Sequence, residues 1–454
     1  MASLPTSQQL AEWLANHKND LVGAALAVIS NDGQIESATI GRLCIDKGKV
    51  VNTSTPFMLG SICKVLTATL VLQLVEQGKI GLDDSIVKWL PETKRLYPRS
   101  NPEASIRQIL GHTGGLVDLF EPVKDLDDAV AKLAAQGLVA NPGEIVSYSN
   151  AGYMLLGALL ERITACDWKS MLRSRILDPL QPQPIGVVVD TETKKSEPGK
   201  SAASVDPPPA EDPPVAEDHV RSPDGTFTQQ LMWPRFSGLF AAAGTVTAAS
   251  VIDSAALLRG VLWGNILTLS SRREMAALQY RLPGPSLWCE GWGLGWSVVD
   301  AGRGLLGHMG GSSTFMLGSR EMGKGVVFLS NTANGALVGR QLALRALGFE
   351  ETQIPAMIRT PIMDGNPVDK FRGRYGIPVF FCDILASDDE PGNLLVKSSL
   401  EQGETAALQH VSGSTFIGAL MSIPTEFTFV FRPGDTEARY LHAGFRALTR
   451  IPDN

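Results

Sequence analysis

Hydrophobic and polar positions along the chain follow patterns that predict both helices and strands. Apolar residues recur at helical spacing over residues 8–17, and residues 23–41, "GAALAVISNDGQIESATIG", predict two strands joined by an Asn-Asp-Gly turn. From Ser61 to Gln77 apolar residues return every three or four positions, and Gly78 stands where a helix favours a left-handed terminal residue. Further helical patterns cover residues 105–111, 125–136, 151–164, 168–177, 248–259, 270–279 and 335–346.

Two later regions have the alternation that is typical of strands. The segments "GWGLGWSVVD", "RGLLGHMG" and "GKGVVFLSNT" predict adjacent antiparallel strands with tight turns. Near residues 356–366 the pattern changes, and we expect a boundary there between domains 1–355 and 366–454. The second domain is predicted to be all-β, because five alternating segments follow one another between Gly, Pro, Asp and Ser residues: 371–387, 393–400, 405–419, 425–433 and 438–450.

Composition narrows the class of protein. Of 454 residues, 44% are hydrophobic and 19% charged, which is typical of a globular enzyme. A net charge of −7 gives no basic face for a nucleic-acid partner. Residues 190–218 are rich in Pro, Ser, Lys and Glu and lack apolar periodicity, which indicates an exposed insertion, with a mobile lid as the alternative.

Apolar runs and cysteine spacing indicate where the protein is located and whether it binds a cofactor. No run approaches the roughly 18 apolar residues of a membrane span, and the N-terminus lacks a signal-peptide pattern, so we expect no membrane partner and a cytoplasmic protein. The cysteines form no Cys-x-x-Cys pair, so neither a disulfide framework nor a metal site is indicated, and no cofactor is expected. The sequence leaves the oligomeric state open.

One helix start carries residues suited to nucleophilic catalysis. A serine hydroxyl is a poor nucleophile at neutral pH unless a neighbouring base takes its proton. Ser61 and Lys64 stand three residues apart, which places them on one helical face, and an apolar first turn weakens the hold of Lys64 on its proton. A second Ser-x-x-Lys pair, Ser85 and Lys88, follows two aspartates and stops at Pro91, which favours a solvated turn.

Two further motifs supply what acyl transfer requires besides a nucleophile. In "NPGEIVSYSNAGYMLLG", Tyr148 and Asn150 stand on a turn before a helix, although a tyrosine buried in the core is an alternative interpretation. In "LLGHMGGSSTF", His308 precedes Gly310 and Gly311 on an expected strand. Glycines weaken a strand unless something approaches the backbone closely, and a substrate carbonyl would do so.

Other candidates have alternative interpretations. His112 and His442 also begin His-x-Gly matches; a turn with a hydrogen-bonded histidine is expected for the first, and a surface or core position in the β domain for the second. Trp288, Trp292 and Trp296 either line an acyl pocket beside the strand of the third motif or fill the core.

With these motifs the chain resembles the serine β-lactamase and penicillin-binding-protein superfamily, specifically its class C-like esterase, D-aminopeptidase and peptidase branch. The resemblance spans about residues 5–350 and rests on Ser-x-x-Lys at 61–64, Tyr-x-Asn at 148–150 and His-x-Gly at 308–310, in the family's order. The family usually has serine where Gly114 stands. No Gly-x-Ser-x-Gly occurs, which argues against an α/β-hydrolase.

The resemblance implies an α+β fold, an α/β sandwich. An antiparallel sheet would be flanked by helices and joined by an all-helical subdomain. The C-terminal domain would be a small antiparallel β-barrel similar to a lipocalin. Such barrels occur in family members that are D-specific peptidases, and in penicillin-binding-protein-type thioesterases that cyclise peptides.

The resemblance also implies roles for individual residues. Ser61 would become acylated, Lys64 and Tyr148 would share the role of base, and Asn150 would hold Lys64 and the amide of the acyl chain. The backbone N–H groups of Ser61 and Gly311 would form the oxyanion hole. Gly310, Ser312, Trp288 and Trp292 are expected to contact the substrate.

His308 stands where β-lactamases and transpeptidases carry lysine, so weaker carboxylate binding is implied. We therefore expect a small-molecule or peptide substrate with an ester, thioester or amide bond, released to water as in an esterase or D-stereospecific peptidase. Release to an amine, as in a cyclising thioesterase or acyltransferase, is one alternative. A catalytically inactive binding protein is the other, since a fold alone does not establish a function.

Overall fold

The computed structural model describes most of the chain. The described residues are 3–45, 48–97, 102–119, 121–180, 215–222, 224–229, 238–244, 247–311, 313–349, 368–378, 380–387, 393–399, 405–420 and 423–452. The expected domain boundary at residues 356–366 lies outside them, as does nearly all of the expected insertion over 190–218.

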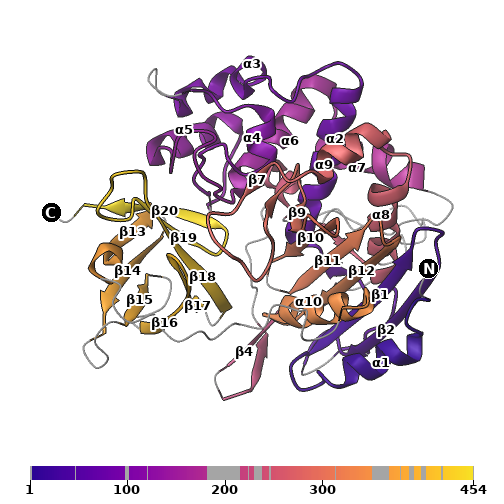
Figure 1. Cartoon of the computed structure of the whole chain (residues 1–454). Coiled ribbons are helices and arrows are strands. Elements are labelled where there is room, and N and C mark those ends of the chain that lie inside the picture. The colour runs from indigo at the N-terminus through magenta and orange to yellow at the C-terminus, as the bar shows by residue number, and fades with distance from the viewer. Residues whose placement is uncertain are drawn as a thin grey trace, which may run out of the picture. The chain divides into compact units, whose positions relative to one another are not determined.

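Except for α3, the helices form where the apolar periodicity predicts them (Figure 1). They are α1 (Ser7–Ala15), α2 (Cys63–Glu76), α3 (Ile86–Trp89), α4 (Ile106–Leu110), α5 (Leu126–Gln136), α6 (Asn150–Thr164), α7 (Trp168–Leu172), α8 (Val251–Trp263), α9 (Leu269–Ala276) and α10 (Gly335–Ala346). Short 3₁₀ turns are η1 (Gly60–Ile62), η2 (Pro91–Leu96), η4 (Asp178–Leu180), η5 (Gly238–Ala243) and η7 (Val368–Phe371), and η3 (Arg173–Leu177) is a π-helical turn.

The described residues belong to two compact units. The first contains Met1–Cys63, Leu172–Asn265 and His308–Gly348, and the second contains Lys64–Met171, Ile266–Gly307 and Phe349–Asn454.

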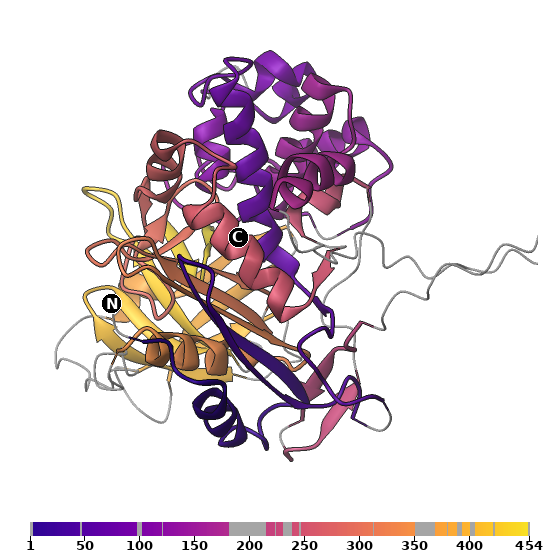
Figure 2. The same cartoon turned by 90° about the vertical axis from the view of Figure 1, so that its right-hand side faces the viewer.

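The first unit is built on antiparallel strands covered by helices. Its strands follow the order β2-β1-β12-β11-β10, where the bounds are β1 (Gly23–Ser30), β2 (Ile35–Gly41), β10 (Leu305–Gly310), β11 (Thr314–Ser319) and β12 (Lys324–Ser330). Gly325 of β12 faces Leu258 of α8, whereas Phe328 packs against Gly339 of α10. Positions three apart on a strand point to opposite faces. Figure 2 accordingly shows α8 on one face and α10 on the other.

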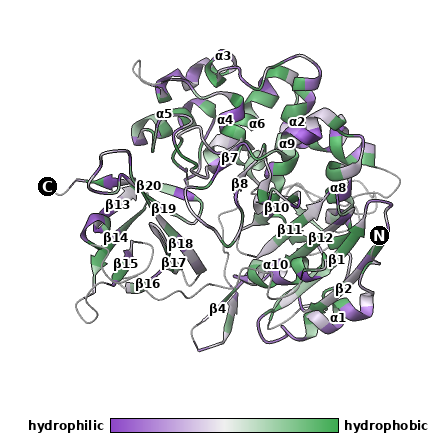
Figure 3. Ribbon diagram, in the orientation of Figure 1, coloured by the Kyte–Doolittle hydropathy of each residue, from purple (hydrophilic) through white to green (hydrophobic). Residues whose placement is uncertain are grey.

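Burial on both faces explains the composition of the central strand. Nearly every residue of β1 is buried, and it reads as a continuous apolar run rather than an alternating one. The hydrophobic colouring of β1 is visible in Figure 3. Two-residue strands β3 (Phe57–Met58) and β6 (Ala248–Ala249) pair with each other, and β4 (His219–Arg221) pairs with β5 (Phe227–Gln229).

Two expectations for this unit were wrong. The three predicted adjacent strands are not all neighbours, because β11 lies between β10 and β12. Every residue of β11 is buried, so it has no alternation to reveal it. The helix expected from residue 248 begins at Val251 instead, since Ala248 and Ala249 form β6 and the Ser250 hydroxyl caps the helix by accepting from the Asp253 N–H.

The second unit contains the helical segment α2 to α7, the strands β7 (Tyr280–Arg281), β8 (Gly291–Trp292) and β9 (Ser297–Asp300), and a barrel. At the start of α6 the Ser149 hydroxyl accepts a 3.1 Å hydrogen bond from the Gly152 N–H, a standard N-cap. Residues Ala151 to Leu160 of α6 are all buried, which makes this helix the core of the helical segment.

The C-terminal barrel is closed by eight antiparallel strands. They are β13 (Gly373–Ile377), β14 (Phe380–Ala386), β15 (Leu394–Ser398), β16 (Thr405–Ser412), β17 (Thr415–Leu420), β18 (Ile423–Val430), β19 (Tyr440–Ala443) and β20 (Arg446–Ile451), and β20 pairs with β13. The predicted all-β domain is thereby confirmed. Five predicted segments correspond to eight strands because the hairpin turns are too short to interrupt the alternation.

Aromatic side chains fill the barrel core. Phe371 and Phe429 stack with ring centres 4.8 Å apart, and Phe416 and Tyr375 also pack on Phe429. All four are buried in one hydrophobic cluster.

Among the helices that the structure describes, none is long and apolar enough to cross a membrane.

Candidate functional site

Ser61 occupies a 3₁₀ turn at the start of helix α2. It lies in η1, which runs directly into α2, so Lys64 follows three residues later at the start of that helix. Gly60 has a φ of +54°, a conformation that favours glycine. The turn is tied to the first unit by the Leu59 N–H, which donates to the Thr247 carbonyl at 2.9 Å.

The turn that carries Ser61 lies against the two glycines of the third motif. A Cβ on Gly60 would sit 3.0 Å from the carbonyl carbon of Gly310 and 3.2 Å from the nitrogen of Gly311. Gly311 has a φ of +61°. The structure thus brings the backbone of Gly60, the residue before Ser61, against the backbones of Gly310 and Gly311.

The reason for one of these glycines differs from the expected one. A Cβ on Gly310 would lie 2.0 Å from the Leu59 carbonyl oxygen and 2.1 Å from Thr314 Oγ1. The close approach that excludes a side chain at Gly310 is therefore made by the chain itself and does not require a substrate. Ser312 lies outside the described residues.

His308 is on β10, as predicted, and is buried. Its Nδ1 lies 2.7 Å from the Met309 carbonyl oxygen. Because a carbonyl oxygen can only accept, this contact requires a proton on Nδ1.

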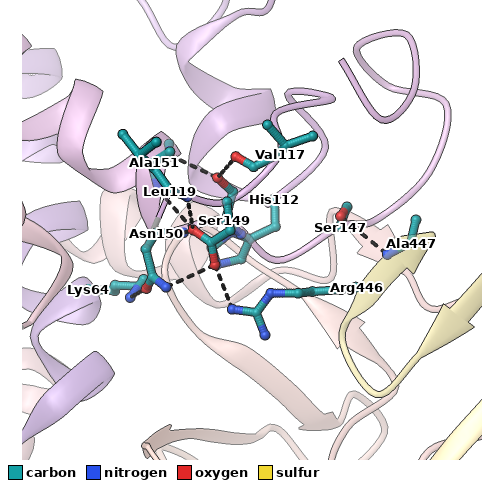
Figure 4. A network of polar contacts seen from close by, with 12 residues as sticks. Lys64, His112, Val117, Leu119, Ser147, Ser149, Asn150, Ala151, Arg446 and Ala447 are labelled. Carbon is teal, nitrogen blue, oxygen red and sulfur yellow. Dashed lines mark hydrogen bonds and ion pairs between the residues drawn. The ribbon is translucent and has the colours of Figure 1, made fainter. Parts of the chain in front are cut away.

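Lys64 is fully buried at the start of the second unit. Its Nζ donates a 2.7 Å hydrogen bond to Asn150 Oδ1 and lies 4.9 Å from the ring centre of Tyr148 and 5.6 Å from that of Tyr153 (Figure 4 shows the contact with Asn150). Three residues that the sequence assigned to one site, Lys64, Tyr148 and Asn150, are therefore adjacent.

Asp118 fixes the amide of Asn150. The Asn150 side-chain Nδ2 donates to Asp118 Oδ2 at 3.0 Å, and its backbone N–H donates to Asp118 Oδ1 at 2.7 Å. The Ala151 N–H also donates to Oδ1, at 3.3 Å. A carboxylate at the N-terminus of α6 is favoured by the free N–H groups there. With its NH₂ group bound to Asp118, Asn150 presents its oxygen to Lys64.

Tyr148 is surrounded by aromatic rings and by the barrel hairpin β19–β20. The His112 ring lies 4.3 Å and the Trp292 ring 5.5 Å from the Tyr148 ring, centre to centre. The Tyr148 N–H donates to the Phe445 carbonyl at 2.7 Å, and the Arg446 guanidinium lies 5.2 Å from the ring centre. The expected hydrogen-bonded histidine in a turn is confirmed, since His112 Nδ1 accepts from the Ser149 N–H.

The remaining candidates divide between this cluster and other places. Trp292 is buried beside Tyr148, and Trp288 is also buried. Ser85 caps α3, and Lys88 lies within that helix, where it forms a partly exposed ion pair with Asp84. The second Ser-x-x-Lys pair is therefore solvated as expected, but it belongs to a short helix rather than to the predicted turn. Within the described ranges, no three His, Cys, Asp or Glu side chains gather as a metal ion would require.

Sequence reasoning missed Asp118 and Arg446. Arg446 Nη2 lies 2.6 Å from Asp118 Oδ2, whose side chain is completely buried. A signal for Asp118 was present, because it stands in "LVDLF" between residues that are buried, and a carboxylate in such a setting needs partners. Arg446 stands in "HAGFRAL" and has no comparable local signal.

Comparisons with known proteins agree with the fold. Penicillin-binding protein 4 of Amycolatopsis lactamdurans is 35% identical over 163 residues, which cover 35% of this chain and 42% of that protein. The match thus spans less than half the length of that curated relative. Crystal structures of SurE, alone and with D-Leu, superpose with TM-scores of 0.72 and 0.71 at 25% and 24% identity. They cover 98% of this chain, and 98% and 99% of SurE.

A third similar structure is EstCE1, described as a hydrolase with promiscuous acyltransferase activity. Its TM-score is 0.60 at 20% identity, over 75% of this chain and 97% of EstCE1. The sequence of residues 9–348 matches the Beta-lactamase family, which is three quarters of the chain. The chain therefore belongs to the beta-lactamase family.

Proposed function

We propose that the protein is a serine acyl-transfer enzyme in which Ser61 forms an acyl-enzyme with an ester, thioester or amide substrate. The observation that carries the proposal is the burial of Lys64, three residues after Ser61, with its Nζ on Asn150 Oδ1 and beside the Tyr148 ring. Burial disfavours the charged form of an amine. Lys64 is therefore suited to accept and release a proton during a reaction.

The proposed reaction has two halves. The Ser61 hydroxyl attacks the substrate carbonyl while its proton passes to Lys64 or Tyr148, and the N–H groups of Ser61 and Gly311 bind the oxyanion. The carbon–oxygen bond to Ser61 forms, the bond to the leaving group breaks, and Tyr148 returns a proton to that group. Water or an amine then attacks the acyl-enzyme and regenerates the Ser61 hydroxyl.

We propose an acyl group with a D-configured residue and an uncharged contact at His308. Support for the first part comes from SurE, whose crystal structure holds D-Leu. Support for the second is that His308 stands where β-lactamases carry lysine, and that its Nδ1 faces the Met309 carbonyl oxygen and not a carboxylate. A neutral ring binds a substrate carboxylate less strongly than the lysine of β-lactamases would.

Intact mass after brief exposure to activated acyl esters and D-amino-acid thioesters tests the proposal. Wild type should gain one acyl mass that maps to Ser61, and Ser61→Ala should gain none. Ser85→Ala is a matched control, because Ser85 also precedes a lysine by three residues but caps α3. Labelling that persists in Ser61→Ala, or that is lost in Ser85→Ala, would contradict the assignment.

The same experiment distinguishes water from an amine as the acceptor of the acyl group. Decay of the acyl-enzyme is followed with and without added amine, and the amide and acid products are quantified. A product ratio that rises with amine concentration identifies an acyltransferase, whereas a constant yield of acid identifies a hydrolase. Absence of any adduct across the panel would favour a binding protein.

A further inference from the structure

The hairpin β19–β20 of the barrel reaches the residues around Lys64. Between Ala443 and Arg446 the turn consists of Gly444 and Phe445. Besides the Tyr148–Phe445 hydrogen bond, the Ala447 N–H donates to Ser147 Oγ at 3.2 Å. Arg446 extends from this anchored turn toward Asn150 and Ser149, as Figure 4 shows.

Asp118 receives the guanidinium of Arg446 on the same oxygen that binds the Asn150 amide. Oδ2 accepts from Arg446 Nη2 at 2.6 Å and from Asn150 Nδ2 at 3.0 Å. A buried carboxylate is costly unless a cation and hydrogen-bond donors compensate it. Arg446 supplies the cation for Asp118, and the start of α6 supplies the N–H donors.

An asparagine amide can point either its oxygen or its nitrogen toward a neighbour. If Asn150 turned over, its NH₂ group would face the Lys64 ammonium, where both groups only donate. Asp118 prevents this by binding Nδ2, because a carboxylate only accepts. The hydrogen-bonded series therefore runs from Arg446 through Asp118 and Asn150 to Lys64.

We infer that Arg446 and Asp118 are positioning residues for acyl transfer, and that the barrel supplies one of them. Asp118 orients the Asn150 amide that holds Lys64. Arg446 offsets the charge of Asp118, which would otherwise strengthen the hold of Lys64 on its proton. This inference rests on the acyl-transfer function proposed above. It gives the barrel a part in the reaction that does not involve ligand storage, in keeping with its aromatic core.

Two opposite shifts in the proton affinity of Lys64 follow from this arrangement. Replacing Arg446 by methionine leaves a negative charge near Lys64, which stabilises the ammonium, so the pKa of Lys64 should rise by about one unit. Replacing Asp118 by asparagine leaves a positive charge, so the pKa should fall. Among the described residues, the titratable side chains that contact Lys64, or a ring that contacts it, include His112, Tyr148 and Tyr153, and they are unchanged in both variants.

The shifts can be measured without turnover. In full-length Ser61→Ala protein labelled with ¹³Cε-lysine, the Lys64 signal is assigned by its loss in Lys64→Met and titrated by NMR. Arg446→Met and Asp118→Asn are introduced separately into the Ser61→Ala protein. Arg450→Met is the matched control, because Arg450 lies on the same strand but bonds Tyr375 and Glu437 within the barrel.

We expect a higher pKa in Arg446→Met, a lower one in Asp118→Asn and no change in Arg450→Met. An unchanged pKa in Arg446→Met, or shifts of the same sign in both variants, would overturn the inference. Should Arg446→Met fail to fold, Arg446→Lys is titrated instead. Arg446→Lys retains the positive charge, so the pKa of Lys64 should stay as in the Ser61→Ala parent. The inference is then tested by Asp118→Asn, which should lower the pKa of Lys64.

Kinetics with Ser61 intact provide the second readout. Arg446→Met should shift the acid limb of the pH profile for acylation upward by the same amount, and lower acylation about tenfold at neutral pH for a one-unit shift. Arg446→Lys should recover most of the rate. Acylation that does not respond to Arg446→Met would overturn the inference. Failure of wild type to acylate would instead refute the proposed function. The NMR titration of Lys64 would still test the inference that Arg446 and Asp118 set the proton affinity of Lys64.

Discussion

The backbone N–H of Tyr148 donates a 2.7 Å hydrogen bond to the carbonyl oxygen of Phe445, so a turn of the C-terminal barrel holds the proposed proton carrier. The two residues lie in the same compact unit. Phe445 also places its ring edge-on against Trp292, at 5.7 Å between centres. The conformation of this short turn therefore bears directly on the position of Tyr148.

Gly444→Ala should reduce activity through this turn. Gly444 has a φ of +59°, and Gly413 in the hairpin β16–β17 has a φ of +55° with no atom near its missing Cβ. Alanine should cost about 1–2 kcal/mol of stability at each position. Only Gly444→Ala should lower kcat/KM, by about tenfold or more, because a small displacement of a catalytic group is costly. Equal kcat/KM in the two variants, measured with an activated ester, would contradict this prediction.

Tyr148→Phe and Tyr153→Phe separate a reacting phenol from a structural one. Both rings face Lys64, but the Tyr153 hydroxyl donates to the Leu110 carbonyl at 2.8 Å, and burial raises its pKa well above 10. Tyr148→Phe should lower the acylation rate by a factor on the order of 10²–10⁴. Tyr153→Phe should lose about 1–2 kcal/mol of stability and keep its rate. Stopped-flow acylation and urea unfolding of both variants check this, and a larger rate loss in Tyr153→Phe would reverse the assignment.

Gly60 and Gly78 flank α2 and form another matched pair. Both have positive φ, +54° and +66°, but a Cβ on Gly78 would meet nothing within 4 Å. Gly60→Ala should push the Ser61 turn away from Gly310 and Gly311 and lower kcat by a factor on the order of 10²–10³, as loss of an oxyanion donor does. Gly78→Ala should cost only about 1 kcal/mol of stability. Full kcat in Gly60→Ala, with the fold verified by circular dichroism, would show that this contact does not serve the oxyanion.

His442 should make the protein less stable in acid. Burial lowers its pKa from 6.5 to about 4, although a hydrogen bond with the Val146 backbone opposes the shift. Between pH 6.5 and 4 the unfolded chain therefore binds a proton that the folded chain does not. The free energy of unfolding should fall as pH falls through this window, by about 2–3 kcal/mol from this group.

Urea unfolding at pH 7 and pH 4.5 measures that contribution. His442→Gln should lessen the difference in unfolding free energy between the two pH values by about 2 kcal/mol. His410→Gln, a change on β16 of the same barrel, is the control and should leave the difference as in wild type. An undiminished difference in His442→Gln would exclude this histidine as the source.

The parts of the structure that could be predicted from sequence are those that depend on residues close together in the chain. Helix α6 follows a serine N-cap and the Tyr-x-Asn motif, and the left-handed Gly78 follows the apolar periodicity of α2. Ser61 and Lys64 are three residues apart, so their spacing predicts a shared helical face without knowledge of the rest of the chain. The relation between motifs came from resemblance to a family.

What escaped prediction depends on contacts that leave no periodic pattern. The strand β11 is buried throughout, so alternation cannot mark it, and the hairpin turns of the barrel are too short to separate their strands. The role of Gly310 depends on the carbonyl of Leu59, far away in the sequence. Asp118 was visible only as a carboxylate among apolar residues, and nothing near Arg446 pointed to it as the partner.

The ion pair of Asp118 and Arg446 joins residues 328 positions apart. Contacts of such high sequence separation close late in folding, because the entropy of closing a long loop opposes them until much of the chain is ordered. A chain that has formed α2 and α6 would therefore hold its nucleophile and its lysine before the barrel hairpin docks. On refolding from denaturant, helical circular dichroism should therefore return before acylation does, because Arg446 reaches Asp118 only when the barrel hairpin has formed.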